Sequence, residues 1–248
     1  MEIPFALKAS DGKTIFGTRN TKDNESVSDT AVIFVHGLAA KPSSHNFHGA
    51  AHTYPAEGVD TIRFSLYDDK DEARKLHECT LDTHASDLHV VLNHFRDTYT
   101  TIALVGHSLG CPAILQSSSE LADIIILWEP AHLTKSLGTD FPKVEFEGSI
   151  YTVLPGGVGY LLNTEMLEQL KRFNINDELQ MIAALKKLLL IIAAKGSRLE
   201  QGAQIYFDTA LDPKQFISIE GTNHSFDEEG KEEELLNHTL AWIKKHRH

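Results

Sequence analysis

A serine flanked by glycines has the most specific chemical setting in this sequence. Gly106-His107-Ser108-Leu109-Gly110 matches the pattern G-x-S-x-G and directly follows a strand-like run at 101–105. Small residues around the serine allow a sharp turn from a strand into a helix, which leaves the hydroxyl exposed at the turn. The N-terminus of the helix also favours developing negative charge. The pattern predicts that Ser108 is a nucleophile.

A serine hydroxyl needs an adjacent base to become a strong nucleophile, and His224 is the predicted base. It lies in Gly221-Thr222-Asn223-His224-Ser225-Phe226, directly after the apolar run at 215–219. This position fits the chain order serine, acid, histidine. The sequence contains 14 histidines, so the position after the last strand-like run carries this prediction.

Two backbone N–H groups are predicted to bind the negative oxygen that forms when the serine attacks. His36-Gly37-Leu38 ends the strand-like run at 31–35, and a turn there can direct the N–H of Leu38 at the substrate oxygen. The N–H of Leu109, directly after the nucleophile, is the second donor. Donation by the backbone makes the type of both side chains nearly irrelevant.

Glu129 is the predicted acid of a catalytic triad. The strand-like run at 123–128 leads into Glu129-Pro130-Ala131, and catalytic groups gather at the C-terminal ends of strands in open α/β sheets. The alternative is a carboxylate that only caps a turn. Glu200 is a rival acid, but Ser197-Arg198-Leu199-Glu200 fits an S-x-x-E capping box, in which both end residues bind backbone N–H groups.

The elements that position these residues alternate between strand and helix. A hairpin is expected at 3–8 and 14–18, and the remaining strands at 31–35, 60–65, 101–105, 123–128, 188–194 and 215–219. Helices are expected at 47–54, 82–96 and 108–121, and from 198 and 231 onward. This order predicts an α/β fold with a mainly parallel sheet and helices on both faces.

The stretch 132–187 interrupts the alternation and is too long for an ordinary connection. It contains a possible hairpin at 144–153, a glycine-rich turn at Pro155-Gly156-Gly157 and helical segments after Asn163. We interpret residues 1–248 as a single domain with a cap, or lid, inserted at 132–187. Its apolar residues could line an acyl pocket: Tyr151, Val153, Tyr160, Leu161 and Leu162. The alternative is an insertion without substrate contact.

Composition narrows the functional classes. A net charge of −12 argues against a nucleic-acid partner, which would need clustered basic residues. The longest apolar run, at 188–194, is too short to span a membrane, and the first residues lack the pattern of a secretory signal, which predicts a cytoplasmic protein. His45, His48 and His52 could share a helix face, but without nearby carboxylate or thiolate ligands they do not predict a metal site.

The remaining reactive residues have ordinary explanations. His107 is expected to support the turn around Ser108. Cys111 is expected to be a small buried helix residue rather than a second nucleophile. Nothing in the spacing of Cys79 and Cys111 requires a disulfide. The motifs imply no metal, nucleotide or organic cofactor.

Taken together, the turn at 36–37, the motif at 106–110 and the loop at 221–226 make the chain similar to the α/β-hydrolase family of serine hydrolases. Within the family it resembles single-domain bacterial carboxylesterases of the feruloyl/cinnamoyl-esterase and monoglyceride-lipase type. Those relatives usually carry an aspartate where this sequence has Ser197. Some lipases of this fold instead keep their acid in an Asp-Pro-Ala setting similar to that of Glu129.

The resemblance implies serine-dependent hydrolysis of a small carboxylic ester through an acyl-enzyme intermediate. Thioesterase, amidase or perhydrolase activity would use the same residues and is the first alternative. A non-catalytic, hydrolase-like binding protein is the second, because the customary aspartate is missing. The acyl group, the alcohol and the oligomeric state are left open by the sequence.

Overall fold

A mostly parallel sheet forms the centre of the structure. The computed structural model describes residues 1–23, 28–117, 119–131, 142–146, 148–154, 160–172 and 175–248. Within these residues eight strands make one sheet in the order β1-β2-β4-β3-β5-β6-β10-β11. Their bounds are β1 (Glu2–Lys8), β2 (Thr14–Asn20), β3 (Thr30–Val35), β4 (Asp60–Phe64), β5 (Thr101–His107), β6 (Ile124–Trp128), β10 (Leu188–Ala194) and β11 (Lys214–Ile219).

Antiparallel pairing is confined to the first edge of this sheet. β1 pairs with β2, and β2 pairs with β4, in antiparallel registers. The neighbouring pairs from β4 to β11 are parallel. The predicted opening hairpin and the predicted fold class are therefore confirmed.

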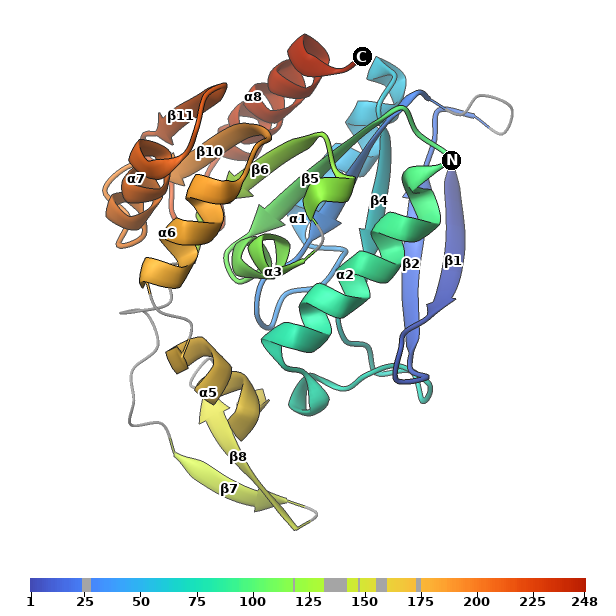
Figure 1. Ribbon diagram of the computed structural model, residues 1–248. Helices are drawn as coiled ribbons and strands as arrows, with labels where there is room; N and C mark the ends of the chain where they lie inside the picture. Colours follow the sequence, from blue (N-terminus) through green and yellow to red (C-terminus); the bar gives the residue numbers. More distant parts are fainter. Residues whose placement is uncertain (24–27, 118, 132–141, 147, 155–159, 173–174) are drawn as a thin grey trace.

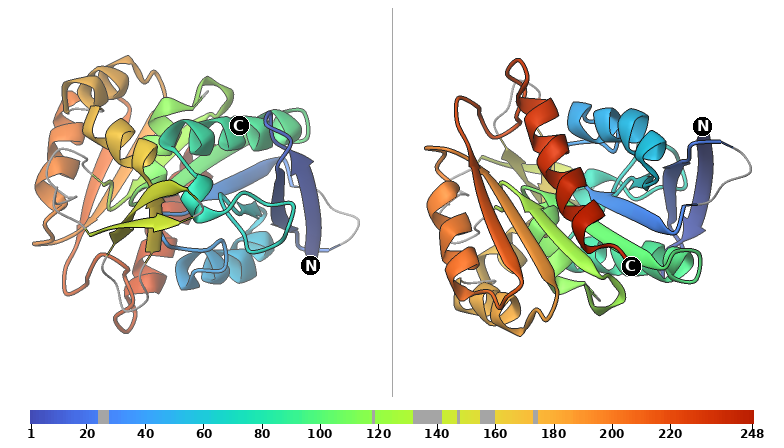
Figure 2. Two further views of the ribbon diagram at one scale, coloured as in Figure 1. Left: turned by 90° about the horizontal axis from the view of Figure 1, so that it is seen from below. Right: turned by 90° about the horizontal axis from the view of Figure 1, so that it is seen from above.

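Helices cover both faces of the sheet, as Figures 1 and 2 show. α1 (His45–Thr53) and α8 (Lys231–His246) lie on one face, and α2 (Leu81–Arg96), α3 (Gly110–Gln116) and α7 (Glu200–Thr209) lie on the other. Short 3₁₀ turns occur at η1 (Tyr54–Glu57), η2 (Leu76–Glu78) and η3 (Ser119–Leu121). None of the helices in the described ranges has the length and apolar character needed to cross a membrane.

The double cover explains why the central strands are continuous apolar runs. Successive side chains of a strand point to opposite faces. Val32 and Phe34 accordingly pack toward α1 and α8, whereas Ile33 and Val35 pack toward α2 and α3. All four side chains are buried, so every position of β3 has to be apolar.

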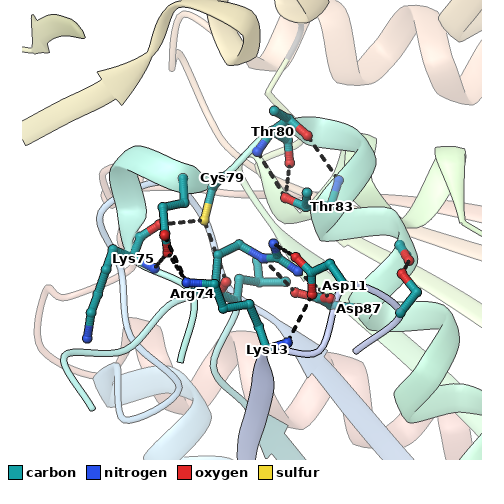
Figure 3. A network of polar contacts seen from close by, with 12 residues as sticks. Asp11, Lys13, Arg74, Lys75, Cys79, Thr80, Thr83 and Asp87 are labelled. Atoms are coloured by element: carbon teal, nitrogen blue, oxygen red, sulfur yellow. Dashed lines mark hydrogen bonds and ion pairs between the residues drawn. The ribbon is translucent and has the colours of Figure 1, made fainter. Parts of the chain in front are cut away.

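A buried arginine fixes the connection between β4 and α2 against α2 and the first hairpin. The guanidinium of Arg74 binds Asp87 of α2 at 3.0 Å and Asp11 of the first hairpin turn at 2.5 Å (Figure 3). Next to it, the hydroxyl of Thr80 accepts the N–H of Thr83 at 3.1 Å, and the Thr83 hydroxyl accepts the N–H of Thr80 at 2.9 Å. This reciprocal cap fixes the first turn of α2.

A second, smaller sheet follows β6 in the chain. It has the order β7-β8-β9 and consists of β7 (Lys143–Phe146), β8 (Ser149–Leu154) and β9 (Tyr160–Asn163), followed by α5 (Thr164–Arg172) and α6 (Ile175–Ala184). Figure 1 shows β7, β8 and α5 on the side where the central parallel strands end. Residues 132–141 of the predicted cap, and its Pro155-Gly156-Gly157 turn, lie outside the described residues.

This segment contacts the elements that cover the main sheet at several places. β9 packs against η2, and the side chain of Gln169 in α5 forms two hydrogen bonds with Asp82 at the start of α2, of 2.9 and 3.2 Å. α6 is also tied to α7, because the buried Glu178 accepts a hydrogen bond from the Tyr206 hydroxyl at 2.5 Å.

The five apolar residues expected to line one pocket divide between the two faces of the small sheet. Val153 lies opposite Leu161 in the register of β8 and β9, and cross-strand partners share a face. Tyr151, two residues from Val153, lies on that face, whereas Tyr160 and Leu162 lie on the other. The five side chains therefore cannot all face one pocket at the edge of the main sheet.

Candidate active site

Ser108 occupies a sharp turn at the end of β5. Its φ is +54°, a left-handed conformation that few residues other than glycine adopt. A side chain at Gly110 would overlap the Val35 carbonyl oxygen, and a Cβ at Gly106 would lie 2.9 Å from the backbone of Gly110. Both glycines are therefore required by close backbone approach, which is the physical reason for the G-x-S-x-G pattern.

The turn is bound to the end of β6. The N–H of Ser108 donates to the carbonyl of Trp128 at 3.0 Å, and the carbonyl of Ser108 accepts the N–H of Ala131 at 3.2 Å. These two bonds lie on either side of Glu129 in the chain. The structure thus brings the predicted nucleophile and the predicted acid to neighbouring strand ends.

Glu129 is completely buried and strained. Its φ is +44°, and its side chain has no exposed surface. Its N–H donates to the carbonyl of Ile192 at 2.8 Å. The carboxylate oxygen Oε1 accepts the N–H of Ala194 at 2.7 Å and the hydroxyl of Ser197 at 2.9 Å. A strained residue held by so many partners is typical of a functional site.

His224 contacts the other oxygen of the same carboxylate. Its Nδ1 lies 3.1 Å from Oε2 of Glu129. An ionised carboxylate only accepts hydrogen bonds, so Nδ1 carries the proton and Nε2 keeps its lone pair. The imidazole side chain is 43% exposed, and it can therefore reach a bound substrate. The structure brings the predicted base and the predicted acid together.

His107 contacts the loop that carries His224. Sequence analysis did not predict this contact. The Nε2 of His107 donates to the backbone carbonyl of His224 at 2.8 Å, and the two ring centroids lie 4.8 Å apart. Burial, reinforced by the neighbouring His224, lowers the pKa of His107 to about 4. The neutral ring therefore packs against the predicted base. The contact joins residues far apart in the chain, so spacing contains no signal for it.

The turn at 36–38 lies directly against the nucleophile. A Cβ at Gly37 would lie 3.0 Å from the Cβ of Ser108, so a larger residue would displace one of the two segments. The N–H groups of Leu38 and Leu109 donate no hydrogen bond within the part of the chain that the structure describes. Both predicted oxyanion donors are therefore available to a ligand.

His36 holds the peptide that carries one of these donors. Its Nε2 accepts the N–H of Leu66 at 3.1 Å, so its Nδ1 carries the proton and donates to the carbonyl of Gly37 at 2.9 Å. In a trans peptide the N–H of Leu38 points away from that carbonyl. The side chain of His36 thus orients the N–H of Leu38.

Lowering the pH from 7 to 5 is expected to destabilise the fold, because His36 and His84 are buried in neutral form. Burial lowers the pKa of His36 to about 4, and burial with the nearby His36 and Arg74 lowers that of His84 to about 3. Both histidines take up a proton near pH 6.5 in the unfolded chain. Each histidine therefore contributes fully to the free energy of unfolding above pH 6.5. Each loses about 2 kcal/mol of that contribution by pH 5.

Urea unfolding at pH 7 and pH 5 measures this loss. His84→Leu is expected to remove about half of the difference in the free energy of unfolding between pH 7 and pH 5. The substitution breaks no hydrogen bond, because neither nitrogen of His84 has a partner among the described residues. His52→Gln is the control, since His52 is exposed. Equal pH dependence in wild type and His84→Leu would contradict the expectation.

Among the described residues, the other candidate groups add neither a metal site nor a second nucleophile. His45, His48 and His52 are exposed on α1, and the described residues contain no group of three or more side chains that could hold a metal ion. Cys79 and Cys111 are buried free thiols. Burial raises the pKa of the Cys111 thiol well above its usual range, which argues against a second nucleophile.

Similarity to known proteins is found in structure and not in sequence. No protein-family model and no curated protein matches the sequence. Est1E from Butyrivibrio proteoclasticus, solved with ferulic acid bound, superposes with a TM-score of 0.81 at 16% identity, covering 98% of this chain and 98% of that chain. The esterase domain of a Rhodothermus marinus protein superposes with a TM-score of 0.73 at 16% identity, covering 99% and 98%.

A third similar structure is described as an α/β hydrolase. The α/β hydrolase GrgF from Penicillium sp. sh18 superposes with a TM-score of 0.76 at 15% identity, covering 100% of this chain and 99% of that chain. The chain has the α/β-hydrolase fold. Those members of this fold that are serine hydrolases carry the serine on a strained turn between a strand and a helix, with the acid and the histidine following it in the chain. Ser108, Glu129 and His224 follow that order.

Sequence analysis placed Ser197 at the position of an aspartate expected from the family resemblance. Ser197 has no carboxylate to offer His224. Its hydroxyl instead binds Glu129 at the end of β6. Glu200 turns away from the site: its carboxylate accepts the N–H of Gly196 at 2.7 Å and the Ser218 hydroxyl at 2.5 Å.

Proposed function

We propose that the protein is a serine carboxylesterase that acts through an acyl-enzyme intermediate. Ser108 is the nucleophile, His224 the general base and Glu129 the acid, and the N–H groups of Leu38 and Leu109 form the oxyanion hole. The observation that carries the proposal is the 3.1 Å contact between Nδ1 of His224 and a completely buried carboxylate. A carboxylate in that position orients the imidazole and stabilises the imidazolium that forms during the reaction.

The reaction has two halves. The Oγ of Ser108 bonds to the acyl carbon while its proton moves to Nε2 of His224, and the carbonyl oxygen becomes negative. When the ester C–O bond breaks, the alcohol takes the proton from Nε2. Water then attacks the acyl-enzyme, transfers a proton to Nε2, and releases the acid while that proton returns to Ser108.

An ester is the favoured substrate among the acyl compounds that such a triad can cleave. Two of the structural neighbours are described as esterases or as binding ferulic acid, an aromatic carboxylic acid. Their support is limited to the shared fold, since identity is 16%. Thioester, amide and peracid chemistry use the same residues.

Activity profiling with a covalent probe tests the proposal. A fluorophosphonate is expected to label the wild-type protein once, at Ser108, and p-nitrophenyl and feruloyl esters are expected to be hydrolysed faster than matched thioesters and amides. Faster cleavage of the thioester or amide would replace the ester assignment. A non-catalytic binding protein would show neither labelling nor turnover.

The segment 132–187 is part of this proposal as a cap over a small-molecule acyl pocket. Tyr160 of β9 is a candidate lining residue of that pocket. Burial, with the nearby Cys79 and Tyr160, raises the pKa of Tyr67. The Tyr67 ring packs edge-on against His36 at 5.1 Å, and its hydroxyl donates to Ala40 at 2.7 Å. β9, which carries Tyr160, packs against η2, and Tyr160 is the lining residue that we propose to test.

Tyr160→Ser is expected to lower the preference for long acyl chains. Removing an aromatic lining should reduce the ratio of kcat/KM for p-nitrophenyl octanoate to that for the acetate by about fivefold. Val144→Ser is the matched control. Val144 is the register partner of Tyr151, so it lies on the face away from Tyr160, and it is 39% exposed. Equal ratios in the three proteins would favour an insertion without substrate contact.

A further inference from the structure

Ser197 stands between the candidate acid and the first turn of α7. Its hydroxyl oxygen accepts the N–H groups of Leu199 at 3.2 Å and Glu200 at 3.1 Å, and it lies 2.9 Å from Oε1 of Glu129. The N–H groups can only donate, and an ionised carboxylate can only accept. The single hydroxyl proton of Ser197 must therefore point at Glu129.

The two oxygens of Glu129 have separate partners. Oε2 faces Nδ1 of His224, whereas Oε1 binds the Ala194 N–H at 2.7 Å and the Ser197 hydroxyl. Ser197 supplies the one side-chain hydrogen bond to Oε1 among the described residues. A carboxylate without exposed surface depends on such donors, because no solvent replaces them.

The backbone around Ser197 is held in place independently of Glu129. The N–H of Ser197 donates to the Ala194 carbonyl at 3.0 Å, and the N–H of Lys195 donates to the Ile219 carbonyl at 2.8 Å. Glu200 closes the loop by accepting the N–H of Gly196 at 2.7 Å. The hydroxyl is thus presented to the carboxylate from a fixed support.

We propose that Ser197 is a positioning residue, whose hydroxyl fixes the Glu129 carboxylate so that Oε2 meets Nδ1 of His224. This inference rests on the proposed function of the triad. Two donors on Oε1 resist rotation of the carboxylate about its last bond, and that rotation would remove Oε2 from the imidazole. The hydroxyl acts on Glu129 and not on the substrate, so its loss is expected to change kcat more than KM.

A series of variants at this position tests the proposal. Ser197→Ala is expected to lower kcat for p-nitrophenyl acetate roughly 10- to 100-fold, the value of a hydrogen bond to a buried charge, with KM within about twofold. Ser197→Thr keeps the hydroxyl and should restore kcat to within about threefold. Ser197→Cys, a weaker donor of similar size, should fall between alanine and threonine.

Ser218→Ala is the matched control. It removes a hydroxyl that donates to Glu200 at the same helix start, and it has no contact with Glu129 among the described residues. Urea unfolding should show comparable losses of stability for Ser218→Ala and Ser197→Ala, with normal kcat only in the former. A kcat for Ser197→Ala equal to that of Ser218→Ala, or a threonine variant that folds without recovering kcat, would overturn the positioning role.

The proposed function can fail separately. A wild-type protein that neither hydrolyses esters nor reacts with the fluorophosphonate would refute the triad itself, and the inference with it. A wild-type protein that does both, with unchanged kcat across the Ser197 series, would refute only the role of Ser197. The same substrate and the same probe therefore separate the two conclusions.

Discussion

Ser108→Ala is expected to lower ester hydrolysis by roughly 10⁴- to 10⁶-fold, because no other group at the turn can form the acyl-enzyme. The neighbouring thiol is an unsuitable substitute: Cys111 is buried, and its Sγ donates to the carbonyl of Gly106 at 3.2 Å. The remaining rate would come from substrate binding and from the backbone donors at Leu38 and Leu109.

The fold of this variant should be unchanged. Ser108 makes its hydrogen bonds to Trp128 and Ala131 through backbone atoms, and alanine retains both. Urea unfolding and p-nitrophenyl acetate hydrolysis are measured together, with Cys111→Ser as the control that keeps the proposed nucleophile. Retention of most turnover in Ser108→Ala, or loss of fluorophosphonate labelling in Cys111→Ser alone, would contradict the serine mechanism.

The order of secondary-structure elements could be predicted because it depends on local patterns. Strands covered on both faces must be apolar throughout, and the runs at 31–35 and 188–194 therefore stood out as buried strands. The helix expected at 108–121 is shorter in the structure, because α3 ends at Gln116. Ser117 turns its hydroxyl back to the Ile114 carbonyl at 2.8 Å, and such bonds compete with continuation of a helix.

The partners of the candidate acid could be predicted only in part. The end of the strand at 123–128 identified Glu129, because strand ends converge at one edge of a parallel sheet. The register of β6 against β10, which brings Ala194 and Ser197 to Oε1, is a tertiary property that no local pattern encodes. The capping box expected from Ser197 and Glu200 is also only half formed, since the Glu200 carboxylate binds the N–H of Gly196 instead.

The two faces of the small sheet illustrate the same limit of local patterns. Apolar composition suggested one pocket lining, but the register of β8 against β9 separates Tyr160 from Val153. A shift of one residue would exchange the two faces. The assignment of Ser108, His224 and Glu129 as a catalytic triad stays a prediction that mutagenesis has to test.

Glu129→Gln is expected to lower kcat by about 10²- to 10⁴-fold through the tautomer of His224. The position of Oε1 receives two donors, from Ala194 and Ser197, so the amide oxygen of the glutamine should take that place. Its NH₂ group then faces Nδ1 of His224 and needs an acceptor there. The imidazole proton is forced onto Nε2, where the lone pair is required to take the proton from Ser108.

Glu200→Gln is the matched control for the loss of a carboxylate. Glu200 binds Gly196 and Ser218 and has no contact with His224 among the described residues, so this variant should mainly lose stability, by about 1 kcal/mol. Both variants are compared in kcat for p-nitrophenyl acetate and in urea unfolding. A larger loss of turnover in Glu200→Gln would make Glu200 the acid. Near-normal turnover in both, with the Ser108→Ala effect intact, would indicate that Ser108 and His224 act as a dyad.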